Sequence, residues 1–154
     1  MSMLIDIISP FLSALFATLG FGLLYNIHGK NLITAAFCGA FAWMVYLVAD
    51  AFTDSMVIPY FLSGMAIAVY SEFAATICRS PVTVFLIPGI IPLVPGLTIY
   101  RTMETCLFGD VSGFAQGLVN TLKIGGAISL GLILVSSVFR LLRTATKAKK
   151  QAQS

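Results

Sequence analysis

The chain has 154 residues, of which 58% are hydrophobic and only 10% are charged, and its mean hydropathy is +0.98. A sequence this apolar excludes a soluble domain, because it lacks the polar side chains needed to cover a water-exposed surface. The formal net charge of +3 is small, so the positions of the charges are more informative than their sum. We predict an all-α, polytopic membrane helix bundle over residues 1–143, followed by a basic cytoplasmic tail at 144–154.

Hydrophobic segments of sufficient length recur along the chain. A helix needs about 20 apolar residues to cross the hydrocarbon core of a bilayer. On this criterion the sequence predicts five spans, separated by short polar or charged turns. In chain order they cover residues 4–25, 32–49, 56–78, 82–107 and 111–142.

The distribution of basic residues predicts the orientation of these spans. Cytoplasmic loops are enriched in lysine and arginine, and a periplasmic N-terminus with a cytoplasmic C-terminus places most of the cations inside. A four-span alternative, in which residues 82–107 form a re-entrant hairpin, agrees less well with this rule. The cations placed inside are Lys30, Arg79, Arg140, Arg143, Lys147, Lys149 and Lys150.

The fourth span is interrupted by a segment rich in proline and glycine. Proline lacks a backbone donor and clashes with the preceding turn, so a continuous helix cannot pass through this segment. Unwound backbone at membrane depth is tolerated only where protein covers it or a polar cavity solvates it, and broken helices of this kind hold substrates in many secondary transporters. We therefore expect a substrate path lined by Pro88, Gly89, Pro92, Pro95 and Gly96.

Two charged side chains are candidates for contact with a solute. Arg101 follows the interruption, and it either pairs with Glu104 on the same helix face or points back to bind a substrate carboxylate. Glu72 lies inside the third span, where a carboxylate costs roughly 2.5–3.5 kcal/mol on insertion scales. It either couples protons to transport or is the structural partner of Arg79 or of a cation on another helix.

The last span carries a small residue at every fourth position. At helical spacing, such residues allow another helix to approach closely. The pattern predicts either a subunit interface or packing against a helix of the same chain. The residues are Gly109, Gly113, Gly117, Thr121, Gly125 and Ser129.

Motifs for other functions are missing from the sequence. There is no Walker A, GxSxG or GxGxxG fingerprint, and the single histidine, His28, excludes an HExxH pair. The cysteines have no metal-binding spacing. We therefore expect no enzymatic activity, no metal and no cofactor. The basic tail is interpreted as an anchor to anionic lipid headgroups rather than a nucleic-acid site.

The segment from Arg79 through residues 88–96 to Arg101 resembles the C-terminal half of the threonine/serine exporter family. The length and the number of spans are similar to those of its short stand-alone members. This resemblance implies secondary-active export of small carboxylate-bearing metabolites across the bacterial inner membrane, either threonine and serine or dicarboxylates such as succinate. It also implies a separately encoded, YjjP-like larger membrane subunit, for which the small residues of the last span would offer a surface. The alternative is a non-transporting scaffold that stabilises a partner transporter subunit.

Overall fold

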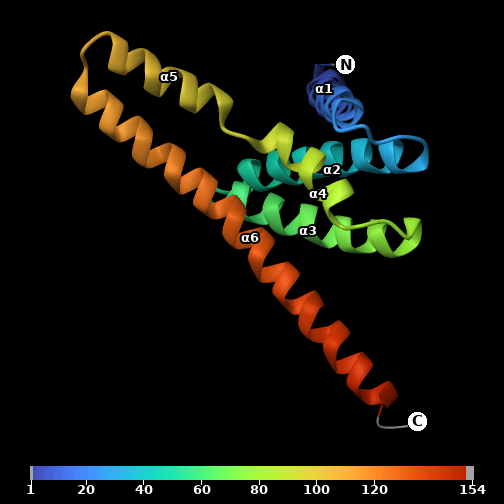
Figure 1. Cartoon of the computed structure of the whole chain (residues 1–154). Coiled ribbons are helices and arrows are strands. Elements are labelled where there is room, and N and C mark those ends of the chain that lie inside the picture. Colours follow the sequence, from blue (N-terminus) through green and yellow to red (C-terminus); the bar gives the residue numbers. More distant parts are fainter. Residues whose placement is uncertain (1, 152–154) are drawn as a thin grey trace.

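The computed structural model describes the backbone of residues 2–151 and the side chains of residues 7–145. Over this part of the chain the structure consists of helices joined by short turns (Figure 1). The side chains of Lys147, Lys149 and Lys150, which entered the prediction of orientation, lie outside the described residues. The helices are α1 (Ser2–Leu24), α2 (Lys30–Phe52), α3 (Ile58–Cys78), α4 (Thr83–Ile90), α5 (Gly96–Leu107) and α6 (Val111–Gln151), with a single 3-10 turn, η1 (Ile91–Leu93), between α4 and α5.

The predicted membrane bundle is confirmed. Among the described residues, 4 helices are long and apolar enough to cross a membrane, and the bent pair formed by α4–η1 and α5 raises the number to 5 when it is counted as one span. The pair is bent by 50°, so the fourth span is broken as expected. Helix α6 has 41 residues, which at 1.5 Å per residue gives roughly 60 Å, about twice the thickness of the hydrocarbon core.

Small side chains on α2 allow the other helices to pack closely around it. This helix contacts α1, α3 and α4, and its buried face consists of Ala35, Ala36, Cys38, Gly39, Ala40, Ala42 and Ala49. Gly39 lies directly against the Thr18 hydroxyl of α1, where any larger side chain would collide. Without water to drive association, close backbone approach of this kind is a main source of helix–helix attraction in membranes.

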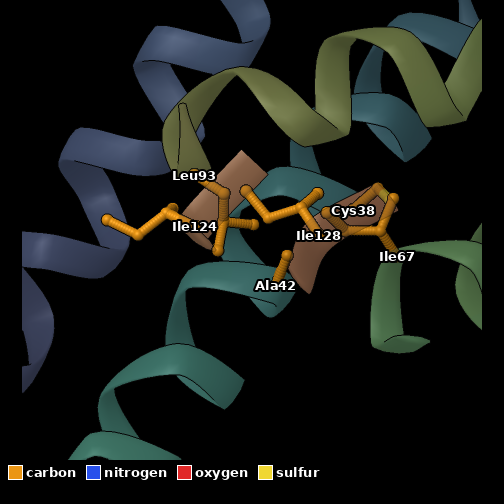
Figure 2. Close-up of a cluster of buried hydrophobic side chains, with 6 residues drawn as sticks. All are labelled: Cys38, Ala42, Ile67, Leu93, Ile124 and Ile128. Carbon is orange, nitrogen blue, oxygen red and sulfur yellow. The ribbon is translucent and has the colours of Figure 1, made fainter. Parts of the chain in front are cut away.

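The centre of the bundle is one apolar cluster to which four elements contribute (Figure 2). Leu93 of η1 is fully buried there, as is Ile67 of α3. Because η1 belongs to the Pro/Gly segment, this cluster fixes the broken span to the rest of the bundle. The buried members are Cys38, Ala42, Ile67, Leu93, Ile124 and Ile128.

Helices α3 and α6 lie side by side and run in the same direction. A Cβ atom added to Gly64 would lie 2.7 Å from the Ile128 carbonyl oxygen, so the two backbones are in contact there. Further along, the rings of Phe73 and Phe139 meet edge to face with their centroids 5.9 Å apart. Helix α6 therefore contacts α3 repeatedly between Ile128 and Phe139.

The start of α6 pairs instead with α5, and Figure 1 shows this helical hairpin standing clear of the other helices. The turn between them contains Gly109, whose φ of 77° favours glycine. Asp110 caps α6, because its Oδ1 atom accepts hydrogen bonds from the Gly113 N–H at 2.9 Å and the Ser112 hydroxyl at 2.8 Å. The Gly113 and Ser112 bonds hold the pKa of this carboxyl below its usual value.

Candidate functional site

The interruption of the fourth span is shorter than the sequence predicted. Expecting unwound backbone throughout residues 88–96 was wrong, since α4 continues through Pro88 and Gly89 to Ile90 and η1 follows at once. A proline in a helix removes one hydrogen bond without ending the helix. Pro92 has no backbone N–H to donate, and the chain here changes from the α-helix α4 to the narrower 3-10 turn η1. The Ile91 N–H donates to the Pro88 carbonyl.

The true break lies at Val94 and Pro95. Val94 is extended, with φ −59° and ψ 128°, as is usual for a residue that precedes proline. Pro95 has φ −75° and ψ 56°, and the Gly96 N–H donates to the Val94 carbonyl at 2.7 Å. These values describe an inverse γ-turn, after which α5 starts in a new direction.

Most residues of the Pro/Gly segment serve helix packing. Pro88 and Gly89 are buried, and a Cβ atom on Gly89 would lie 2.9 Å from the Cys38 sulfur. Pro92 faces an apolar groove of about 260 Å³ beside α1 and Trp43, whereas Gly96 is exposed. A substrate path along these residues therefore stays a prediction.

A polar cavity lies beside the break, at the end of the bundle where α2 is joined to α3. We call this the α2–α3 end. The cavity has a volume of about 430 Å³ and is walled by α2, the following loop, α3, α5 and α6. The rings of Tyr46 and Tyr60 are in contact in its wall, tilted by 51° with centroids 4.7 Å apart. Its lining residues are Tyr46, Asp50, Thr53, Asp54, Ser55, Met56, Tyr60, Thr98 and Ile124.

Arg101 lines a second, smaller cavity of about 230 Å³ between α5 and α6. Met56 and Thr98 belong to the walls of both cavities, so the two spaces adjoin. The predicted alternative of an Arg101–Glu104 pair does not form. Within residues 7–145 the structure shows one ion pair, and it joins α3 to α6. The exposed guanidinium of Arg101 is thus free to meet a ligand close to the carboxylates of the polar cavity.

Sequence reasoning identified Arg101 but did not count the acidic residues of the adjoining polar cavity among the site residues. Asp50 lies near the end of α2 and Asp54 in the loop that follows, with Tyr46 one turn before Asp50 and Tyr60 in the first turn of α3. Two carboxylates four residues apart were a visible local signal. That Thr98 of α5 completes the same cavity could not be read from the sequence, because it depends on the bend at Val94–Pro95.

The ion pair links Glu72 of α3 to Arg143 of α6. The Arg143 Nη2 atom donates to Glu72 Oε2 at 2.7 Å, and the relative exposures of the two side chains are 54% and 9%. The partner is therefore a cation on another helix, one of the two predicted structural alternatives. The other alternative, Arg79, is wrong: this residue ends α3 in the left-handed conformation, with its N–H bonded to the Ala75 carbonyl.

The stripe of small residues does not form one face. A step of four residues on an α-helix turns by roughly 40° beyond a full revolution, so such a stripe winds around the helix. Gly113 and Gly117 face α5, with Gly117 against Thr102. Gly109 lies in the turn before the helix, contrary to the prediction. The space beside Gly125 is open and Ser129 is exposed, so a subunit interface there stays a prediction. The Thr121 hydroxyl bonds to the Gly117 carbonyl of its own helix.

A bundle of apolar helices with a broken span and a polar cavity beside the break is typical of membrane transport proteins. Comparison with known families is specific: residues 10–138 match the family model described as "Threonine/Serine exporter, ThrE". The chain belongs to this family, which supports a role in export across a membrane. No curated protein and no solved structure gives a significant match.

Proposed function

We propose that this chain is a subunit of a secondary-active exporter that moves small carboxylate-bearing metabolites across the bacterial inner membrane. Membership of the threonine/serine exporter family supports the exporter role. The observation that carries the substrate class is the position of Arg101, an exposed guanidinium in a cavity that adjoins the polar one. A guanidinium binds a carboxylate through two parallel hydrogen bonds, which suits it to this task.

The proposed orientation rests on the charges at the two ends of the bundle and on the positive-inside rule. The end where α3 is joined to α4, which we call the α3–α4 end, carries Lys30, Arg79 and Arg143. The α2–α3 end carries Asp50 and Asp54. We place the first end in the cytoplasm and the second in the periplasm, so that the N-terminus is periplasmic and the C-terminus cytoplasmic.

The charges around the two cavities favour an amino acid over a dicarboxylate as the solute. An amino acid presents a carboxylate to Arg101 and an ammonium group to Asp50 or Asp54, so both of its charges find an opposite charge nearby. Succinate would place a second carboxylate near the same acidic side chains, and like charges at close range repel. Threonine and serine also carry a hydroxyl that can hydrogen bond to Thr98.

We further propose that the chain works with a YjjP-like larger membrane subunit. The hairpin of α5 with the start of α6 has few neighbours within this chain, and a partner would cover it. The open surface beside Gly125 and the exposed Ser129 lie on the same long helix.

Replacing Arg101 with glutamine is expected to reduce threonine efflux by about tenfold or more, the effect of losing a hydrogen bond between charged groups. Efflux of threonine, serine and succinate would be measured from cells that express the chain with the larger subunit. Lys123→Gln is the matched control, because Lys123 is an exposed cation of α6 outside the walls of both cavities. Equal efflux from the two variants would remove Arg101 from the site. Unchanged efflux after Arg101→Gln, but complete loss when this chain is omitted, would favour the scaffold.

Glu72→Gln tests the proposed role of Glu72 in proton coupling. If Glu72 carries the coupled proton, the variant should insert normally and lose the pH dependence of efflux, because a glutamine side chain cannot bind and release a proton as a carboxylate can. The measurement is efflux rate against external pH for wild type and variant at equal protein level. An unchanged pH profile at full activity would reduce Glu72 to the structural partner of Arg143.

A further inference from the structure

The two ends of the bundle differ in how they are closed. At the α2–α3 end, the cavity of about 430 Å³ lies between helices. Toward the α3–α4 end, the side chains of Glu72 and Arg143 join α3 to α6, with Nη2 and Oε2 2.7 Å apart. A transporter that exposes its site to one side at a time needs contacts that hold the other side shut.

The contacts between α3 and α6 are of two kinds. At Gly64 and Gly131 the helix backbones touch, since a Cβ atom on Gly64 would lie 2.7 Å from the Ile128 carbonyl oxygen. This contact has no side chains that could move aside. About two to three turns further along, the helices are joined by side-chain contacts, the Phe73–Phe139 ring contact and the Glu72–Arg143 pair. The first contact is therefore suited to act as a fixed pivot and the second as a releasable one.

We propose that the Glu72–Arg143 ion pair is a latch that closes the α3–α4 end, and that α6 swings away from α3 about the Gly64–Gly131 contact when the pair breaks. The latch rests on the proposed transport function, since its purpose is to control access of the solute from that end. Glu72 and Arg143 act by positioning the helices and do not themselves bind the solute.

A thiol placed between α3 and α6 reports on this movement. Val135 of α6 is buried and lies between Gly131 and Phe139, two residues that contact α3. In Val135→Cys, opening of the latch should expose the thiol, while the native Cys38 stays protected in the central cluster. Cys78 packs against α2 and α4, and Cys106 is exposed on α5, so both are replaced with serine.

The test is the rate of N-ethylmaleimide labelling of the thiol of Val135→Cys in the full chain, reconstituted in lipid vesicles in the Cys78→Ser/Cys106→Ser background. Arg143→Gln should raise this rate by up to about fivefold, the factor by which an ion pair with one half-exposed partner shifts an equilibrium. Arg140→Gln is the matched control, since Arg140 is an exposed cation on the same helix and is not part of the pair. It should leave the rate unchanged.

Labelling of the buried Cys38 in Arg143→Gln would indicate that this variant unfolds. In that case the charge-swapped double variant Glu72→Arg/Arg143→Glu, which restores an ion pair, decides the outcome. A swapped pair that keeps Cys38 protected and returns the labelling rate of Val135→Cys toward that of the native pair supports the latch. Fast labelling of Val135→Cys in the swapped variant overturns the latch, as does an unchanged rate in a folded Arg143→Gln. Labelling requires no transport, so the two proposals can fail separately. The latch can be wrong while Arg101→Gln still reduces efflux, and the latch can be right while Arg101→Gln leaves efflux unchanged.

Discussion

Leu93→Ala is expected to destabilise the folded protein by about 2–5 kcal/mol, the range for deleting a fully buried leucine side chain. Leu93 is 0% exposed and belongs to the central cluster, to which α2, α3 and α6 also contribute residues (Figure 2). It lies one residue before the break at Val94–Pro95. The cavity left by alanine would therefore weaken the attachment of the broken span as well as the core.

The matched control for this prediction is Leu107→Ala. Leu107 is 86% exposed at the end of α5, so the same deletion removes few contacts within the chain. The free energy of unfolding of both variants would be measured by denaturant titration in the same detergent. Equal stabilities would contradict the view that the central cluster holds the broken span in place.

Gly131→Ala is expected to cost about 1–3 kcal/mol, the range for overpacking a closely packed site. The added methyl group would meet the Phe61 carbonyl oxygen of α3, which is part of the backbone and cannot move aside alone. Helix α6 would have to shift away from α3 along its second half. The Glu72–Arg143 pair at the far end should weaken as a consequence.

Gly126→Ala separates this steric effect from helix propensity. Gly126 is five residues earlier on the same helix, and nothing lies within 4 Å of a Cβ atom placed there. Alanine favours the helix over glycine by up to about 1 kcal/mol, so this control should be neutral or stabilising. The melting temperatures of the two variants in detergent give the comparison. A Gly131→Ala variant as stable as Gly126→Ala would show that α3 and α6 tolerate a wider separation.

The sequence was a good guide to elements whose cause is local. Long apolar runs predicted the spans, because crossing a membrane requires length and hydrophobicity that any window of the chain reveals. The prolines of residues 88–96 predicted that the fourth span is broken for an equally local reason, the loss of backbone donors. The extent of unwinding was overestimated, since Pro88 lies in a helix that packing against Cys38 and Ile67 supports.

Contacts between residues distant in sequence could not be predicted from such local features. Arg79 was the nearest cation to Glu72 along the chain, but the actual partner, Arg143, is 71 residues away. The stripe of small residues on α6 suggested one interface. The rotation of the helix instead turns Gly117 toward α5 and Gly125 toward open space.

By itself the sequence determined that this chain is an all-helical membrane protein with a broken span, and it identified Arg101 as a candidate ligand for a carboxylate. Each of these follows from the composition or from the chemistry of residues close together in the chain. Only the tertiary structure brought Thr98 of α5 into one cavity with Asp50 and Asp54 of the α2–α3 end, with Arg101 in the adjoining cavity. The physical reason is the 50° bend of the fourth span, which follows directly after Leu93, a buried member of the central cluster.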